Sequence, residues 1–260
     1  MGAVEAVYFH LKLAHQWRAR FALCDGRIEL MSPLWGQEWY CVRGKFVKLS
    51  KLLSRKGLYP FLEQQFGKIP AGAKVLNIGA GGDIGKTLMR HAAQQQFQVV
   101  ALDIDAQRRP DIVGDICAYD FKGQQFDTIV MAEILEHIHS PHLALENVHR
   151  VLKDSGRLIL TAPFIFPIHD RPYDYYRYTR YGLEYLLRHF HDISIKERNT
   201  WAEAIDVLSA RLIMDKNWPA RILAPFLVLL AFIQWPISFL IARLVRTDFI
   251  TSGYVVTARK

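Results

Sequence analysis

Apolar residues recur at helical spacing in the first part of the chain and at strand spacing further on. In residues 4–21 they form one helical stripe, with Lys and Arg off the stripe. Residues 42–57 repeat this pattern with more Lys and Arg. Both patterns predict amphipathic helices with basic polar faces. The second helix is expected to pack on the core by its apolar face or to lie on a membrane surface.

Strand and helix patterns alternate from residue 74 onward. Short apolar runs cover residues 74–78, 99–102, 128–131 and 157–161, and a helical stretch covers residues 86–95 after the first run. Strands separated by helices predict a mostly parallel sheet with helices on both faces. In such a sheet, ligands bind beyond the carboxyl ends of the strands.

Positive charge is concentrated at the two ends of this 260-residue chain. The formal net charge of +8 consists of +6 in residues 1–70, −3 in residues 71–215 and +5 in residues 216–260. The basic ends are expected to face an anionic partner, either a lipid surface or nucleic acid, or else to form an ordinary solvated surface. The three cysteines lack metal-binding spacing, and their odd number fits a reducing cytosolic compartment.

The segment GAGGDIGKT, residues 79–87, fits two patterns that hold different cofactors. From Ala80 its spacing is that of a phosphate-binding P-loop, with Ala in place of the first Gly. However, the second strand ends in Asp103, where a carboxylate accepts hydrogen bonds from ribose hydroxyls. The dinucleotide pattern GxGxxG also fails, because Ile84 stands where its third glycine is expected. These features favour a nucleoside with a free ribose, and a P-loop ATPase stays a remote alternative.

Three carboxylates, Asp103, Asp115 and Glu133, follow successive strands and should meet at one crevice. Such a cluster repels a polyphosphate. A cationic sulfonium with ribose and adenine groups would be accommodated there.

Five segments in order over residues 75–164 resemble the motifs of class I S-adenosylmethionine-dependent methyltransferases: VLNIGAGG, VVALDID, DIVGDI, FDTIVMAEILEHIHSP and RVLKDSGRLILTAPF. The resemblance, of the methyltransferase type 11-like bacterial kind, implies a Rossmann-like α/β fold with a seven-stranded, mostly parallel sheet. It also implies S-adenosyl-L-methionine as the cofactor. Residues 169–179 are similar to a stretch in bacterial proteins associated with cell-surface polysaccharide or lipid pathways.

The resemblance assigns roles to individual positions. Glycines in the first turn would let the backbone approach the methionine part of the cofactor, the next carboxylate would bind the ribose, and two following residues would contact the adenine. Asn77 stands where the family usually has Asp or Glu, so its contact with the cofactor is expected to differ. The predicted cofactor-binding residues are Asn77, Gly79, Gly81, Asp103, Asp115, Ile116 and Glu133.

Two histidines are candidate bases for an acceptor that is a weak nucleophile. His137 follows the fourth strand and His169 follows the fifth, and imidazole titrates near neutral pH. Either side chain could instead have a structural role. Glu133, Glu136 and His137 also resemble the ExxEH motif of ubiquinone-pathway O-methyltransferases, whose implied role includes a divalent metal. The same spacing is common at a polar helix start, and no metal is assigned.

Tyrosines and arginines crowd residues 171–181 and make this segment the candidate acceptor site. Tyrosine rings stack on sugars or aromatic rings, and arginines bind phosphate or carboxylate. An RNA acceptor would use the same residue types, and a lid packed on the sheet by its aromatic rings would also explain them. The predicted substrate residues are Asp174, Tyr175, Arg177 and Tyr178.

Residues 222–242 form an uncharged apolar segment long enough to cross a bilayer. In the resembled fold, however, the strand after it inserts antiparallel into the core sheet, so both ends of the segment must lie on one side of the membrane. Pro225 and Pro236 predict a broken helix pair that enters one leaflet or lies along it. Burial on the protein or in a dimer is the alternative.

The chain is thus predicted to have an N-terminal basic helical extension (1–70), a methyltransferase core (71–215), an apolar helical insertion (216–249) and the last core strand (250–260). We expect a cytoplasmic enzyme bound monotopically to an anionic membrane surface, methylating a small or lipid-linked acceptor such as a cell-surface glycan or lipid precursor. Nucleic acid is not expected as a partner, and the oligomeric state is left open. The alternatives are an RNA or protein methyltransferase and a non-catalytic cofactor-binding scaffold.

Overall fold

A computed structural model describes residues 21–24, 27–30, 37–215 and 217–260. The helix predicted over residues 4–21 lies outside this part of the chain except for Phe21, which opens strand β1 (Phe21–Cys24). Strand β1 pairs with β2 (Arg27–Leu30) as an antiparallel hairpin. The described N-terminal residues therefore contain a hairpin ahead of the second predicted helix, which is observed as α2 (Gln37–Arg55).

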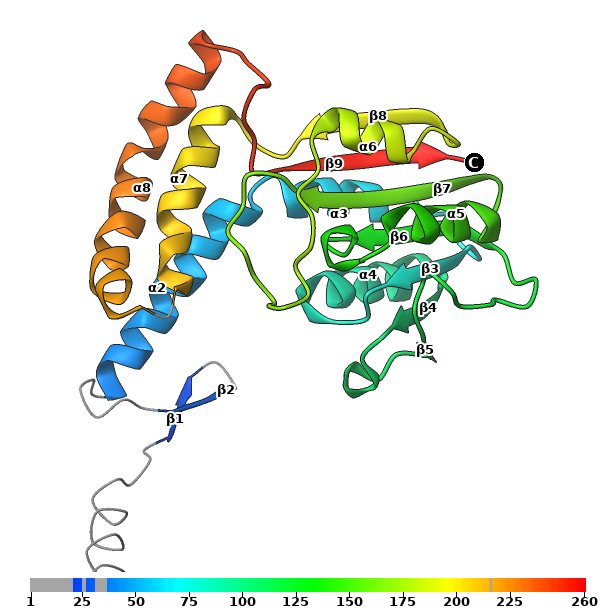
Figure 1. Ribbon diagram of the computed structural model, residues 1–260, viewed down its shortest axis with the longest axis horizontal. Coiled ribbons are helices and arrows are strands. Elements are labelled where there is room, and N and C mark those ends of the chain that lie inside the picture. Colours follow the sequence, from blue (N-terminus) through cyan, green and yellow to red (C-terminus); the bar gives the residue numbers. More distant parts are fainter. Residues whose placement is uncertain (1–20, 25–26, 31–36, 216) are drawn as a thin grey trace, which may run out of the picture.

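The core is one seven-stranded sheet in the order β5-β4-β3-β6-β7-β9-β8 (Figure 1). Its strands are β3 (Lys74–Ile78), β4 (Gln98–Asp103), β5 (Ile112–Val113), β6 (Phe126–Ala132), β7 (Leu152–Pro163), β8 (His191–Glu197) and β9 (Gly253–Arg259). The last strand, β9, runs antiparallel between β7 and β8, which confirms its predicted position. The carboxyl ends of β3, β4, β6 and β7 consequently lie along one edge of the sheet.

Helices cover both faces of this sheet, as predicted for strands that are buried on both sides. On one face, α3 (Leu58–Phe66) and α4 (Gly82–Gln95) pack against side chains such as Val75. On the other face, α5 (Pro141–Val151) and α6 (Arg180–Leu186) pack against the next residue, Leu76. Successive residues of a strand point to opposite faces, so the apolar run of β3 serves both layers.

Three further helices form a separate unit beside the sheet edge to which β7 points (Figure 1). They are α2 (Gln37–Arg55), α7 (Trp201–Arg211) and α8 (Trp218–Leu244). Their shared core contains Leu53, Val207, Ala224, Val228 and Ala231. This unit stands next to the carboxyl ends of the strands, where the fold places its ligands.

The apolar insertion differs from the predicted broken pair, because α8 is one continuous helix with Pro225 and Pro236 inside it. A proline removes one backbone hydrogen bond but leaves side-chain packing possible. Ala224, Val228 and Ala231 are buried against the neighbouring helices on a stripe that runs past the first proline. Tertiary packing thus holds the helix together where the local sequence alone indicated a break.

Part of α8, Ile222–Leu244, has the length and mean hydropathy of a membrane-crossing helix. Only 22% of the most apolar 18-residue stretch of this helix is buried in the protein, whereas the core helix of a soluble domain is mostly buried. Length and composition alone are weak evidence for insertion in a membrane.

Candidate functional site

A cavity of about 550 Å³ lies beyond the carboxyl ends of β3 and β4. Four of the predicted cofactor residues line it together: Gly79, Asp103, Asp115 and Ile116. Residues from the ends of different strands meet here because parallel strands direct their carboxyl ends to one edge. The volume suits a nucleoside-sized ligand.

The turn after β3 depends on Gly79, whose φ of +92° is unfavourable for other residues. A Cβ atom at this position would come within 2.4 Å of the Ile134 Cδ1 atom. The Asn77 side-chain amide donates a hydrogen bond to the Gly79 carbonyl at 3.2 Å. Asn77 therefore holds the turn and does not line the cavity. Gly81 lies close to Arg108, because a Cβ atom added at Gly81 would be 3.4 Å from the Arg108 side chain.

The Asp103 carboxylate is buried and is oriented by backbone amides. Its Oδ2 accepts a hydrogen bond from Ala80 N at 2.8 Å, and its Oδ1 accepts one from Asp105 N at 2.9 Å. Arg108 Nη1 lies 3.3 Å from Oδ2. A carboxylate has about four acceptor positions, so Oδ1 keeps capacity for a ribose hydroxyl.

Apolar side chains form the other wall of the cavity. Ile104 is 73% exposed although it is apolar, and it lines the cavity with Ile116 and Ile138. The Asp115 carboxylate accepts a hydrogen bond from Cys117 N at 2.9 Å. Apolar walls beside two carboxylates fit an adenine ring with its donor groups, so the residues present fit S-adenosylmethionine.

Glu133 is not among the residues that line this cavity. Its carboxylate accepts a hydrogen bond from the Thr161 hydroxyl at 2.9 Å and is paired with the guanidinium of Arg198. Its backbone has a positive φ of 55°, which turns the chain at the end of β6. The predicted contact of Glu133 with the cofactor stays a prediction, since both carboxylate interactions are made within the protein.

The two candidate bases, His137 and His169, are brought together around Glu136. The Nε2 atoms of His137 and His169 lie 3.7 Å and 3.8 Å from the same Glu136 oxygen. His137 Nδ1 donates a hydrogen bond to the Tyr173 carbonyl at 2.7 Å, and His169 Nδ1 lies 3.2 Å from the Pro167 carbonyl. Because a carbonyl oxygen only accepts, each Nδ1 carries a proton, and each Nε2 is the ring nitrogen that faces Glu136.

Burial controls the charge state of this group. Glu136 is fully buried, and neither carboxylate oxygen has a hydrogen-bond partner in the described part of the chain. Burial and the nearby charge of Glu133 raise the pKa of the Glu136 carboxyl well above 4.5. Burial also lowers the pKa of His169, with a partial offset from Asp174. A neutral acid and a neutral imidazole therefore face each other.

The same three side chains could hold a divalent metal ion. The ligand atoms of Glu136, His137 and His169 all lie within 4.8 Å of one another. Hydrogen bonds from the Nδ1 atoms to carbonyls are the usual support for metal-binding imidazoles. A second such group, Asp115, Cys117 and His139, is less suitable because burial raises the pKa of the Cys117 thiol to about 11.

The predicted acceptor residues have different surroundings. Tyr175 lines the cavity, together with Tyr173. Asp174 pairs with Arg177, and this hydrogen bond helps lower the pKa of Asp174 to about 2 despite the opposing effect of burial. Tyr178 is buried and donates its hydroxyl proton to the Leu135 carbonyl at 3.0 Å. Three of the four side chains thus shape the segment itself.

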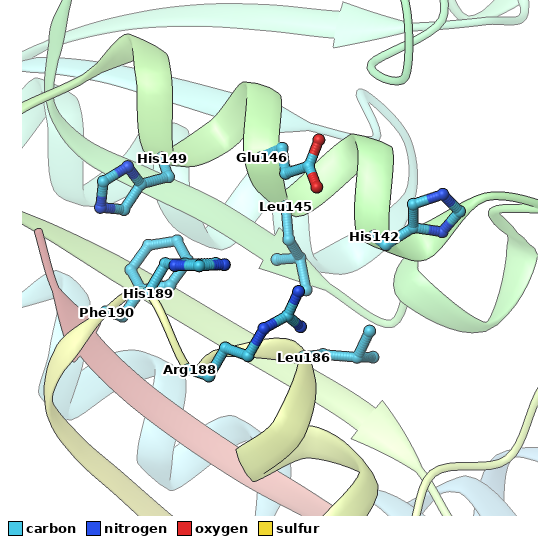
Figure 2. A pocket seen from close by; sticks show the side chains of 8 residues that line it. All are labelled: His142, Leu145, Glu146, His149, Leu186, Arg188, His189 and Phe190. Atoms are coloured by element: carbon cyan, nitrogen blue, oxygen red, sulfur yellow. The ribbon is translucent and has the colours of Figure 1, made fainter.

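A smaller cavity of about 110 Å³ lies between α5 and the turn after α6. Figure 2 shows His142, Glu146 and His149 on α5, opposite Arg188 and His189. Its volume is too small for a nucleoside. The larger cavity at the strand ends is therefore the candidate cofactor site.

Sequence reasoning missed several residues of the larger site. Arg108 and Tyr173 line the cavity, and Arg198 pairs with Glu133. The position of Arg108, just after the strand that ends in Asp103, was a usable signal. No local signal marks Arg198, because it follows β8, far along the chain, and pairs with Glu133 outside the cavity.

Comparison with known proteins agrees with this site. A family model described as a methyltransferase domain matches residues 51–206. A ubiquinone biosynthesis O-methyltransferase of Coxiella burnetii is 28% identical over 187 residues, which cover 65% of this chain and 76% of that protein. A demethylmenaquinone methyltransferase of Renibacterium salmoninarum is 33% identical over 111 residues, covering 39% of this chain and 45% of that protein.

Solved structures share the fold at low sequence identity. The MccD protein has a TM-score of 0.52 and 14% identity, with 79% of this chain and 98% of that chain covered. The [4+2]-cyclase SpnF has a TM-score of 0.50 and 18% identity, with 76% and 80% covered. Because one of these proteins is a cyclase, the fold alone does not specify the reaction.

Proposed function

Because the chain belongs to the methyltransferase-domain family and is a class I S-adenosylmethionine-dependent methyltransferase, we propose that it methylates a lipid-linked or lipid-like acceptor at the cytoplasmic face of a membrane. The acceptor class and the membrane are the proposed parts. A cell-surface glycan or lipid precursor is one such acceptor.

The exposed apolar face of α8 carries this proposal. A stripe at helical spacing contains Phe226, Ile233, Ile237 and Leu244, each more than 60% exposed. Exposed apolar patches of this kind mark membrane or protein contacts. Arg243 and Arg246 follow at the end of α8, where phospholipid headgroups would meet them.

The position of α8 supports an acceptor that comes from the membrane. It belongs to the helical unit beside the carboxyl edge of the sheet, where the cofactor cavity lies (Figure 1). The relatives named for ubiquinone biosynthesis and for demethylmenaquinone support a small lipid-like acceptor.

The cofactor, when bound, supplies a methyl group that is already activated on a sulfonium. The protein then has to orient the acceptor, exclude water and remove a proton from a hydroxyl acceptor. We assign the proton transfer to the Nε2 atoms of His137 and His169. The proton would leave the acceptor oxygen for Nε2, and the electron pair so released would form the new oxygen–carbon bond while the carbon–sulfur bond breaks and its electron pair stays on the sulfur.

A divalent metal ion is the second candidate role for the same histidines. The three ligand atoms of Glu136, His137 and His169 within 4.8 Å of one another favour it. A metal ion would polarise the acceptor oxygen and lower its pKa. Titration with Mn²⁺ separates the two roles. If the histidines hold a metal ion, the wild type binds Mn²⁺ and Glu136→Gln does not. If the histidines act only as general bases, neither protein binds Mn²⁺.

Radiolabelled methyl transfer to fractionated cell material tests the proposed acceptor. The protein and S-adenosyl-[methyl-³H]methionine are incubated separately with membrane lipids, total RNA and soluble protein. Label in the lipid extract supports the proposal, and label confined to RNA or protein overturns it. A non-catalytic scaffold would label none of the fractions while still binding the cofactor.

A further inference from the structure

Arg157 and Arg259 lie directly opposite each other on two neighbouring strands of the core sheet. They are paired in the antiparallel register of β7 and β9, so their side chains lie on the same face of the sheet. Arg157 is also paired with Thr128 near the start of β6, which places both arginines at the amino ends of the parallel strands. Like charges at directly opposed positions are destabilising. An anion between the two guanidinium groups would relieve this repulsion.

Arg157 has no carboxylate partner among the residues that the structure describes. Its Nη2 atom donates a hydrogen bond to the side-chain oxygen of Gln65, a buried residue of α3. Burial and the charge of Arg259 lower the pKa of Arg157. A guanidinium nevertheless stays protonated in proteins. Because the Gln65 amide is neutral, the positive charge of this half-buried side chain is not compensated.

Arg259 and Lys68 add two more cations at the same place. Arg259 Nε lies 3.8 Å from the Oδ2 atom of Asp192, whose side chain is 78% exposed, and long ion pairs with an exposed carboxylate contribute little. Arg259 Nη1 donates a hydrogen bond to the Ser155 carbonyl at 3.1 Å. The ammonium group of Lys68 has neither a hydrogen-bond nor an ion-pair partner in the described ranges. Three cations therefore meet one weakly engaged carboxylate.

A cavity of about 270 Å³ brings these side chains together. Its lining residues are Lys68, Arg157, Asp192, Thr257, Ala258 and Arg259. Thr257 lies two residues before Arg259 on β9, so its hydroxyl is on the same face and can donate a hydrogen bond to an anion. Pockets for drug-sized ligands measure about 300–1,000 Å³. This smaller, positively charged cavity therefore suits a small anion.

The cavity is remote from the cofactor site and from the apolar face of α8. The cofactor cavity lies beyond the carboxyl ends of β3 and β4, whereas this cavity lies at the amino ends of the strands. In Figure 1, β9 runs toward the C-terminus at the right, and α8 stands beyond the opposite end of the sheet at the left. A headgroup of a lipid that contacts α8 would not reach this cavity, which favours an anion from solution.

We propose that Lys68, Arg157 and Arg259 bind the phosphate group of a small soluble molecule, either inorganic phosphate or a phosphate monoester. Guanidinium groups bind phosphate oxygens through paired, charge-assisted hydrogen bonds, and an ammonium adds a third charge-assisted contact. The bound phosphate would also separate the two opposed arginine charges. This inference does not depend on the acceptor class proposed above.

Calorimetric titration with inorganic phosphate and with glycerol 3-phosphate, at constant ionic strength, tests the inference. The wild type is compared with Arg157→Met and Lys68→Met, which keep most of the side-chain volume. Arg150→Met is the matched control, because Arg150 lies on α5, donates a hydrogen bond to Asn147 and does not line the cavity. Loss of one charge-assisted contact should weaken binding about tenfold or more, while the control binds like the wild type. Tighter binding of glycerol 3-phosphate than of inorganic phosphate would assign the site to a monoester.

Equal affinity in the wild type, both variants and the control would overturn the inference, and so would a wild type that binds neither probe. Association with vesicles that contain phosphatidic acid is measured as well. Weaker association of Lys68→Met than of the wild type would assign the site to a lipid headgroup and overturn the soluble source.

S-adenosylmethionine binding serves as the control for folding, because the cofactor cavity lies at the other edge of the sheet. If Arg157→Met loses this binding, the substitution has disturbed the fold, and Lys68→Met, which changes an exposed side chain, then decides the question. If the wild type binds S-adenosylmethionine and vesicles but no phosphate, only this inference fails and the proposed function stands.

Discussion

The imidazole ring of His137 lies edge-on to that of His169, with the ring centres 4.9 Å apart. The two residues follow different strands of the sheet and come from separate segments. Their contact places both candidate bases next to the buried carboxyl of Glu136. One site, and not two, is therefore available for proton transfer.

Asp103→Ala should weaken S-adenosylmethionine binding by about 10- to 100-fold, the cost of losing a hydrogen bond to a charged group. The variant loses the ribose acceptor and also the hydrogen bond from Ala80 N that holds the glycine turn. Calorimetric titration measures the change. Asp154→Ala is the control, because its side chain is 98% exposed and far from the cavity. Unchanged affinity in Asp103→Ala would contradict the assignment.

Glu136→Gln should stabilise the ligand-free protein at neutral pH and raise its Tm by about 2–6 °C. Glu136 is buried without a partner, and its raised pKa means that the folded state holds a proton which the unfolded chain loses above pH 4.5. Its contribution to stability is therefore present in acid and is lost as the pH rises toward the folded pKa.

Thermal unfolding from about pH 5 to about pH 8 checks this prediction. The advantage of Glu136→Gln over the wild type should grow with pH. A constant difference, or a less stable variant at every pH, would show that the carboxyl is partnered in solution.

His169→Gln should lower the turnover number about 10²- to 10⁴-fold with little effect on cofactor affinity, as expected for loss of a general base. Burial lowers the pKa of His169 below 6.5, so the wild-type imidazole is neutral at physiological pH. The activity of the wild-type enzyme should therefore decline only as the pH falls below about 6.5. Methyl transfer to membrane lipid extract gives the measurement, and the exposed His191→Gln is the control. The assignment is wrong if both variants keep the wild-type pH profile.

Phe226→Asp combined with Ile233→Asp should abolish association with vesicles and leave the fold intact. Both side chains are exposed, by 67% and 73%, so a charge there meets no packed neighbour. Each apolar side chain that enters lipid contributes about 1.5–3 kcal/mol, which a charge removes. Vesicle flotation at high salt measures binding, with Tyr181→Asp, 76% exposed on α6, as the control. Flotation of the double variant would show that this face binds something other than lipid.

Several features could be predicted from the sequence because they depend on local chemistry. The bounds of β3 match the predicted apolar run, and Gly79 occupies the positive-φ position that its turn requires. Asp103 lines the cavity because a residue just past a parallel strand lies at the binding edge. These outcomes need only the strand pattern and the order of elements.

Other features depended on which buried groups meet. Asn77 turned out to brace the glycine turn, and Glu133 to pair with Arg198, which follows the edge strand β8. The prolines of α8 did not divide the helix, since packing on α7 outweighed the lost backbone bonds. Such outcomes follow from contacts between residues that are distant in the chain, and local spacing carries no information about them.

From sequence alone one could determine the fold class, the succession of core strands and helices along the chain and the cofactor edge, because strand and turn chemistry acts over a few neighbouring residues. Only the tertiary structure decided that His137, His169 and Glu136 share one site. Burial and the pairing of charges depend on distances in space, and those distances exist only once the helical unit has packed beside the sheet.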